Sequence, residues 1–427
     1  MNEWSSFDTI SKGKGIWLID SQGNEIIDAV GSMWCNVWGH SNPQLVKAIT
    51  KQSKQIQHSS LFNLTNEPAE RLAKNLIKIS PGMNKVFYSD NGSSAMEIAI
   101  KMALQYWKNI GEIKKTQIAT IENGYHGDTF GAMSVGYVPE FFRKFKKQLF
   151  STIQFPVPNE YRLPKGFTLS DYQNHCLEKI EKRFSKNNDI AAFIMESGAQ
   201  MAGGVIIYPK DFQKKIRELC KKYDILFVLD EIATGFGRLG SMVQYQDQKS
   251  IPDIVAYGKM LTGGYLTMAA TLANKKIYDS FSGEFNDWKH LFHGHTYTGN
   301  PIAAAVANEN LQMYEKYNLI KQVQKTSKIF EKYSQEILDI DIVGDVRHKG
   351  MLMGIELVSN KKKKTPIRTK KSINKVFFEE GKKQGIYLRT LGNIVMLVPP
   401  LSIQQNELEL LLKKTIKTIQ VAKSKTF

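Results

Sequence analysis

One lysine stands where an apolar run ends and flexible backbone begins. The segment 253–265 reads DIVAYGKMLTGGY, so Lys259 follows Gly258 and precedes a Thr-Gly-Gly turn. Desolvation lowers the pKa of a lysine and makes its amine a nucleophile, as a Schiff base with an aldehyde cofactor requires. The glycines let the backbone pass close to a ligand. Lys259 is therefore a candidate nucleophile, although a lysine that packs its stem on apolar neighbours gives the same local pattern.

Two carboxylates follow an earlier apolar run. Asp230 and Glu231 come directly after DILFVL at 224–229, and a carboxylate in such semi-buried surroundings needs a partner. A protonated ring nitrogen of a cofactor is one suitable partner, because a nearby carboxylate keeps it charged. Helix capping and magnesium binding are the alternatives that this motif leaves open.

A third motif could bind a phosphate at a strand-to-helix junction. Asn91, Gly92, Ser93 and Ser94 precede a helical pattern; the glycine permits a tight turn, and either serine can cap the helix. The free N–H groups and the positive dipole end of such a helix favour an anion. The motif is neither a Walker loop nor a dinucleotide fingerprint, and an ordinary serine cap is the alternative.

An aromatic residue follows another apolar segment. Tyr125 precedes His126 in NGYHGDTFGAMS, where a flat ring could stack on a flat cofactor or could pack as a surface aromatic.

Three histidines, His290, His293 and His295, lie close together in HLFHGHTYTGNP. No carboxylate or cysteine at the spacing of a zinc site accompanies them, so we expect no metal site. Thr296 and the neighbouring glycines instead suit contact with an anion in a loop before a helix.

Alternating strands and helices are predicted to position these groups. Apolar runs with little polar alternation favour strands that are buried on both faces, at 85–90, 116–122, 190–197 and 224–231. Helical patterns follow at 93–107 and 209–223, so the fold class is α/β with a largely parallel sheet. Ligands of such sheets bind outside the carboxyl ends of the strands, which is where Asp230 lies.

The C-terminal part has a different pattern. A helix at 300–317 leads into two segments, 344–358 and 373–401, that mix strands with a helix, and a charged amphipathic helix follows them. This pattern predicts an α+β unit.

Composition limits the function further. The chain has 427 residues, is 42% hydrophobic and carries a net charge of +17. The lysines are scattered, and the densest run, 360–371, is interrupted by Pro and Thr, so we do not expect nucleic-acid binding. The absence of a long apolar run and of a secretory pattern predicts a cytoplasmic protein with no membrane partner, in which the three cysteines are free thiols.

Five motifs occur in order along about 200 residues and resemble the class-III aminotransferases, which use pyridoxal 5'-phosphate: NGSSAMEIAIKMA, NGYHGDTFGAMS, LDEIATGFGRLG, AYGKMLTGGYLTMAATL and HGHTYTGNP. The resemblance covers nearly the whole chain. It implies fold type I, with a large cofactor-binding domain at 46–305 and a smaller α+β domain formed by 1–45 and 306–427.

The resemblance also implies roles for the candidate residues. Lys259 would bind the cofactor covalently, Asp230 would pair with its ring nitrogen, and Tyr125 would cover its ring and touch the substrate. The phosphate would be bound by Asn91, Gly92 and Ser93 and, from the neighbouring subunit of a homodimer, by His295 and Thr296.

The substrate pocket follows from the same resemblance. Gly294 would line it, and Arg389 in GIYLRTLGNIVMLVPP would receive the substrate carboxylate through a bidentate pair. Met33 and Trp34 occupy the place where the family often has two aromatic residues, so both belong to the predicted pocket.

The expected reaction is a ping-pong transamination of the biotin pathway. The stretches ALQYW, GYHGDTFGAMSVG and DEIATGFGR are most similar to members that aminate 8-amino-7-oxononanoate with S-adenosylmethionine, through pyridoxamine phosphate. Lysine is the alternative donor. A class-III enzyme acting on a diamine, ornithine or 4-aminobutyrate is the alternative activity.

Two departures from the family pattern stand out. The sequence lacks the N-terminal His-Pro-Tyr or His-Pro-Phe element, which neither Trp4 nor Phe7 matches. The usual Glu-Pro after the third strand is Glu196-Ser197 here.

Overall fold

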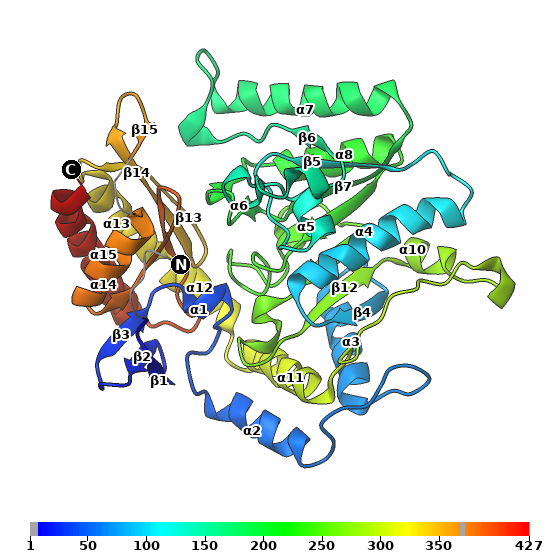
Figure 1. Cartoon of the computed structure of the whole chain (residues 1–427), viewed down its shortest axis with the longest axis horizontal. Helices are drawn as coiled ribbons and strands as arrows, with labels where there is room; N and C mark the ends of the chain where they lie inside the picture. The colour runs from blue at the N-terminus through cyan, green and yellow to red at the C-terminus, as the bar shows by residue number, and fades with distance from the viewer. Residues whose placement is uncertain (1–6, 368–371, 427) are drawn as a thin grey trace.

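The computed structural model describes residues 7–367 and 372–426. Trp4, which lies in the predicted segment 1–45, and part of the lysine-rich run 360–371 lie outside the described residues. The elements form a large sheet flanked by helices and a second group of sheets at the other end of the molecule (Figure 1).

The large sheet has seven strands within the described residues, and five consecutive strands of it run parallel. β12 alone runs antiparallel to both of its neighbours. The order across the sheet is β4 (Lys85–Ser89), β12 (Ala269–Ala273), β11 (Ile254–Tyr257), β10 (Leu226–Asp230), β7 (Ile190–Glu196), β5 (Gln117–Ile121) and β6 (Ile153–Phe155). The prediction of a largely parallel α/β sheet is confirmed.

Both faces of this sheet are covered by apolar side chains, as the unbroken apolar runs predicted. Every residue of β7 and β10 is buried. The helix α4 (Gly92–Asn109) packs on one face, where Trp107 is fully buried and donates its indole N–H to Ala191 O at 2.8 Å. The helices α7 (Leu169–Lys186) and α8 (Phe212–Lys222) contribute to the core on the opposite face.

The two ends of the chain meet in a second group of elements. β3 (Glu25–Asp28), from the hairpin with β1 (Ile10–Lys14) and β2 (Trp17–Asp20), pairs in parallel with β16 (Ile386–Tyr387). The other C-terminal strands form a sheet in the order β13 (Val343–Lys349), β14 (Leu352–Asn360), β18 (Ile394–Leu397) and β17 (Arg389–Leu391), with β15 (Thr365–Pro366) beside β14. The predicted domain boundaries at 45 and 305 stay predictions.

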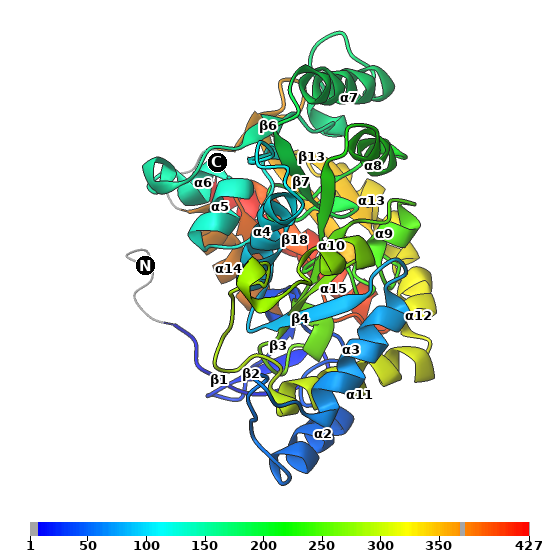
Figure 2. The ribbon, with the colours of Figure 1, turned by 90° about the vertical axis from the view of Figure 1, so that its right-hand side faces the viewer.

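Helices connect and cover these sheets. Figure 2 shows α7 and α2 (Pro43–Ser53) at opposite ends of the molecule. The helix α11 (Pro301–Lys316) packs against α2 and α3 (Glu67–Ile79), and α13 (Lys328–Leu338), α14 (Ile373–Lys383) and α15 (Gln405–Thr426) cover the C-terminal strands. Among the described residues, no helix has the length and apolar character needed to cross a membrane.

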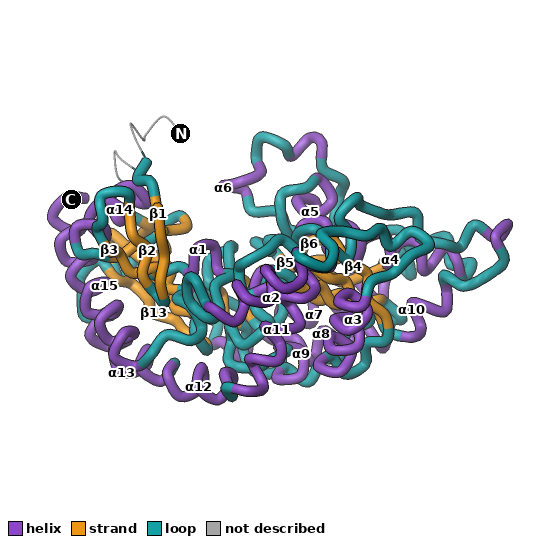
Figure 3. Tube along the Cα trace, turned by 90° about the horizontal axis from the view of Figure 1, so that it is seen from below, coloured by secondary structure: helices purple, strands orange, loops and turns teal. Residues whose placement is uncertain are grey.

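A short segment, α1 (Gly31–Trp34), lies between the N-terminal hairpin strands and the large sheet (Figures 1 and 3). Close to it, the fully buried Arg238 donates to the carbonyl oxygens of Met351 at 2.9 Å and Pro399 at 2.7 Å. These bonds join the loop after β10 to the C-terminal strands.

Candidate active site

A cavity of about 480 Å³ opens at the carboxyl ends of the central parallel strands. It is lined by most of the residues that the sequence predicted: Trp34, Asn91, Gly92, Ser93, Tyr125, Asp230 and Lys259. It also contains two groups without a predicted role, His126 and Glu196.

Lys259 begins the short helix η3 (Lys259–Thr262), and Gly258 alone separates it from the end of β11. Its backbone φ of 41° lies in the left-handed region, which is strained for a residue with a side chain and is typical of functional sites. Burial lowers the pKa of its amine, and the negative charges of Asp230 and Glu196 oppose that shift. The amine therefore loses its proton more readily than an exposed lysine does, as a nucleophile must.

Asp230 ends β10 and is held from two sides. Its Oδ1 accepts the N–H of Ile232 at 2.8 Å, and its Oδ2 accepts Nδ1–H of the buried His126 at 2.8 Å. Since an ionised carboxylate only accepts hydrogen bonds, the Nδ1 proton of His126 follows from this contact. These two contacts fix the orientation of the carboxylate at the edge of the cavity.

Glu196 brings a second carboxyl to the same edge. It pairs with Asp230 in the register of β7 and β10, so both side chains stand at neighbouring strand ends. Its oxygens accept the N–H groups of Met201 at 2.9 Å and Tyr125 at 3.3 Å. Burial raises the pKa of Glu196 to about 7, with a further contribution from Asp230, while His126 acts in the opposite direction.

Sequence reasoning missed the roles of His126 and Glu196. Glu196 was visible as a polar residue directly after an apolar run, the same signal that pointed to Asp230, whereas His126 lies in a loop five residues after β5 ends. No local sequence pattern indicates which strand ends are neighbours in the sheet, and that adjacency decides the contacts.

The helix α4 provides an anion site at its N-terminus. Asn91 caps it by accepting the N–H of Ser94 at 2.9 Å, so Gly92 and Ser93 form its first turn beside the cavity. The loop that contains Gly127 lies very close to this turn, because a Cβ at Gly127 would be 2.3 Å from Ser93 Oγ. The dipole end and N–H groups of this turn suit a phosphate.

Tyr125 is fixed by an aromatic cluster. Its ring stacks on Phe142 with centroids 6.0 Å apart, and its hydroxyl donates to Asp128 Oδ1 at 3.0 Å. Burial raises the pKa of Tyr125 well above its ordinary value, and Asp128 adds to this. The hydroxyl therefore stays protonated across the physiological range.

Two predicted substrate residues meet beside the cavity. Arg389, on β17, places Nη1 2.8 Å from Met33 Sδ, and Met33 is about half exposed. Next to Met33, the Trp34 ring centroid lies 5.4 Å from Lys259 Nζ. Arg389 and Met33 are not among the residues that line the cavity itself.

The loop before α11 lies outside this cavity. Gly294, His295 and Thr296 are not among its lining residues; Thr296 O instead accepts from His58 Nε2 at 2.6 Å, and a Cβ at Gly294 would lie 2.5 Å from the Phe62 ring. Across the described parts of the chain, no group of three or more His, Cys, Asp or Glu side chains is placed to bind a metal.

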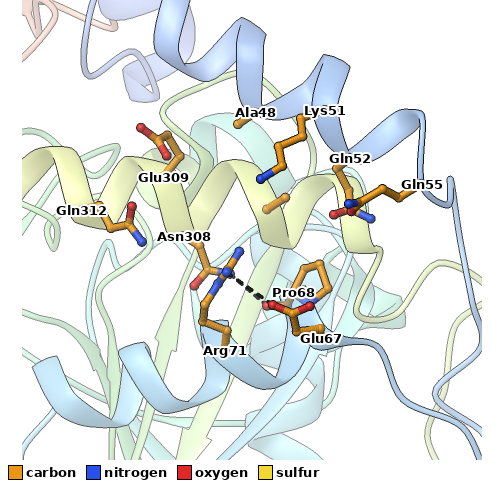
Figure 4. A pocket seen from close by; sticks show the side chains of 11 residues that line it. Ala48, Lys51, Gln52, Gln55, Glu67, Pro68, Arg71, Asn308, Glu309 and Gln312 are labelled. Atoms are coloured by element: carbon orange, nitrogen blue, oxygen red, sulfur yellow. Dashed lines mark hydrogen bonds and ion pairs between the residues drawn. The ribbon is translucent and has the colours of Figure 1, made fainter.

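A second cavity, of about 270 Å³, lies between α2, α3 and α11 (Figure 4). Lys51, Glu67, Arg71 and Glu309 line it, and the ion pair between Arg71 and Glu67, at 3.5 Å, lies within one helix. It shares no lining residue with the first cavity and has no desolvated nucleophile, so the chemistry is concentrated at Lys259.

The residues of the first cavity fit pyridoxal phosphate. They combine a desolvated amine for the aldehyde, a fixed carboxyl group for the ring nitrogen and a helix N-terminus for the phosphate.

Comparison with known proteins agrees with this fit. Residues 2–419 match the family described as Aminotransferase class-III. The chain is 43% identical to the adenosylmethionine-8-amino-7-oxononanoate aminotransferase of Staphylococcus aureus, over 95% of this chain and 90% of that protein. The crystal structure of the enzyme of that name from Methanocaldococcus jannaschii superposes with a TM-score of 0.91 at 40% identity, covering 97% and 93% of the two chains. The putrescine–pyruvate aminotransferase of Pseudomonas aeruginosa is 34% identical, over 94% of this chain and 88% of that one.

The first prediction concerns Lys259. Borohydride reduction of the native protein should fix a pyridoxyl group on Lys259, and Lys259→Ala should carry no such group and lose turnover by at least about 10²-fold. Mass spectrometry of the reduced, digested protein measures this. Lys275→Ala, which removes an exposed lysine, should keep the label. A pyridoxyl group on any other lysine of the native protein would refute the covalent role.

The second prediction follows from the raised pKa of Glu196. Between about pH 4.5 and 7, the folded protein binds more protons at this group than the unfolded chain does, so its stability contribution falls as pH rises. Glu196→Gln should therefore flatten the decline of the melting temperature over this interval. Glu178→Gln, at an exposed position on α7, should leave the profile unchanged. Parallel profiles for Glu196→Gln and the native protein would contradict the shifted pKa.

Proposed function

The chain belongs to the class-III aminotransferase family, whose members depend on pyridoxal 5'-phosphate, and we propose that it aminates 8-amino-7-oxononanoate with S-adenosylmethionine as donor. The product would be 7,8-diaminopelargonate, a biotin precursor. The observation that carries this proposal is the 43% identity, over 95% of the chain, to the Staphylococcus aureus enzyme with that name.

Four parts of the chain would hold the cofactor. Lys259 would bind it covalently, Asp230 would pair with its ring nitrogen, Tyr125 would pack on its ring, and the α4 N-terminus at Asn91, Gly92 and Ser93 would bind its phosphate. When bound, the cofactor supplies an electron-poor ring that draws electrons from the substrate carbon next to the amine.

Lys259 would then act as the acid and base of the reaction. Its Nζ would take the proton from the substrate Cα and later return a proton. Its lowered pKa supports this role, because an amine that loses its proton easily is the better base near neutral pH. His126 keeps the Asp230 side chain oriented through its hydrogen bond of 2.8 Å.

Arg389 would bind the carboxylate of the acceptor. Its guanidinium lies against the Met33 thioether, a weak acceptor, so a carboxylate can replace that contact with a much stronger one. Trp34 would form the wall of the pocket next to Lys259.

The proposed enzyme is a homodimer with shared sites. Phe62, Phe285, Trp288, Phe292 and Tyr297 are exposed, and in the sequence Phe292 and Tyr297 flank the loop with Gly294, His295 and Thr296. A cluster of exposed aromatic residues supports an interface. The loop would reach the phosphate and substrate of the partner, which accounts for its place outside this chain's own cavity.

The free Cys35, Cys176 and Cys220 suit the reducing cytoplasm, the location that we propose.

A second activity has specific support. The 34% identity to a putrescine–pyruvate aminotransferase favours transfer from a terminal amine as the alternative, with a diamine, ornithine or 4-aminobutyrate as donor.

The third prediction identifies the donor. The absorbance of the bound cofactor should change when the purified enzyme meets S-adenosylmethionine and stay constant with putrescine, ornithine or 4-aminobutyrate. Lysine is tested in parallel as the alternative donor to the same acceptor. A response to putrescine without one to S-adenosylmethionine would reject the proposed donor.

The fourth prediction concerns Arg389→Lys. The lysine keeps the charge and loses the two-pronged hydrogen bond, so the KM for 8-amino-7-oxononanoate should rise about tenfold or more. The donor half-reaction, measured separately, should show how far the effect of Arg389→Lys is specific to the carboxylate of 8-amino-7-oxononanoate. Arg143→Lys, at an exposed position, is the matched control and should leave both half-reactions unchanged.

A further inference from the structure

The segment that presents Met33 and Trp34 has an unusual backbone. Ser32 has φ 60° and ψ −80°, and Trp34 has φ 65°. Positive φ is strained for residues with a side chain, and the Ser32 conformation is close to a γ-turn that is rare for this reason. Such a segment keeps its shape only when its surroundings hold it.

Asp28 is the group that holds this segment. It is the last residue of β3 and is fully buried. Its Oδ2 accepts the N–H of Ser32 at 2.6 Å and the Ser32 hydroxyl at 3.3 Å, and its Oδ1 accepts the N–H of Val30 at 3.3 Å. A buried carboxylate with these donors fixes the backbone on both sides of Gly31.

His40 ties this arrangement to the N-terminal hairpin. Its Nε2 lies 3.1 Å from Asp28 Oδ2, and its backbone exchanges two hydrogen bonds with Gly15. The ring also lies against the strand β1, since a Cβ at Gly13 would meet His40 Cβ at 2.7 Å. Asp28, Ser32 and His40 form what we call the Asp28 cluster.

The Asp28 cluster acts on two side chains of the proposed site. The segment that it holds places Met33 Sδ 2.8 Å from Arg389 Nη1 and the Trp34 ring 5.4 Å from Lys259 Nζ. If the segment relaxed, both contacts would change together, because Met33 and Trp34 are consecutive residues.

We propose that Asp28, supported by His40, is a positioning residue that sets the affinity of the site for a substrate carboxylate. It touches neither substrate nor cofactor; it keeps Ser32 in its strained conformation so that Met33 and Trp34 frame Arg389 and Lys259. The inference rests on the proposed function, in which Arg389 receives the carboxylate of the acceptor.

The test compares Asp28→Asn with Asp20→Asn in the cofactor-loaded enzyme. Asp20 is a matched control: it ends β2 of the same hairpin, is buried, and accepts the N–H groups of Gln22 and Asn24 at 2.9 Å. Asparagine has an NH₂ group in place of one carboxylate oxygen. Where this NH₂ group faces the Ser32 N–H, the hydrogen bond from Ser32 to residue 28 is lost. The probe is nonanoate, an unreactive carboxylate with the chain length of the proposed acceptor, and calorimetry measures its binding.

Asp28→Asn should weaken nonanoate binding about tenfold or more, while the pyridoxal phosphate content per chain stays unchanged. Visible circular dichroism of the bound cofactor should also change, because Trp34 stands beside Lys259. Asp20→Asn should alter neither quantity. Adding Ser32→Gly to Asp28→Asn should restore part of the affinity, since glycine adopts positive φ without strain.

A milder variant covers the case in which Asp28→Asn fails to fold. Asp28 also contributes to the field around the buried Arg238, so its neutralisation lowers stability. His40→Ala keeps the Asp28 side chain and removes its contact with the His40 ring, and it should weaken nonanoate binding by about threefold.

Unchanged nonanoate binding and unchanged dichroism in Asp28→Asn and His40→Ala would overturn the proposal, as would equal losses in Asp20→Asn. If the native enzyme binds no nonanoate, the acceptor assignment is wrong, and the dichroism of Asp28→Asn against Asp20→Asn still decides whether the cluster positions the site.

Discussion

The structure depends on keeping an amine and two carboxylates together in a desolvated pocket. Parallel strands end at one edge of the sheet, so β7, β10 and β11 deliver Glu196, Asp230 and Lys259 to adjoining places. Desolvation lowers the pKa of the lysine and raises that of Glu196. The charges of Asp230 and Glu196 oppose the shift of the lysine, whereas Asp230 adds to the shift of Glu196 and His126 opposes it. The unbroken apolar core beneath the strand ends excludes water from one side of these groups, and this exclusion maintains their shifted pKa values.

Strain accompanies this arrangement at two positions. Lys259 and Ser32 both have positive φ, a conformation that costs of order 1–3 kcal/mol for a residue with a side chain. The first strained residue directs the amine, and the second presents the aromatic wall next to it. In both places a histidine contacts a buried carboxylate, His126 at Asp230 and His40 at Asp28.

Sequence patterns predicted the sheet and the residues at its strand ends. The runs at 190–197 and 224–231 became β7 and β10, and the helical pattern at 93–107 became α4, because a strand buried on both faces needs unbroken apolar residues. Lys259 and Asp230 were predicted by the same rule. His126 and Asp28 were not, since their contacts depend on packing: His126 and Asp230 are 104 residues apart in the chain. The pairing of β16 with β3 was equally invisible, because no local pattern encodes which distant edge a short strand will join.

The Glu196-Ser197 pair has a structural explanation that its sequence did not offer. A proline at 197 has no backbone N–H, whereas the N–H of Ser197 donates to Asp230 O at 2.9 Å. This bond continues the ladder between β7 and β10 by one step, at the point where the two carboxylates leave the sheet. The Ser197 hydroxyl accepts from Gln213 Nε2 at 3.1 Å, and Gln213 also donates to Ser250 Oγ at 2.8 Å. Ser197 thus anchors the ends of both strands. Its hydrogen bonds fix the geometry of Glu196 and Asp230, whereas a proline at this position would restrict the backbone through its ring.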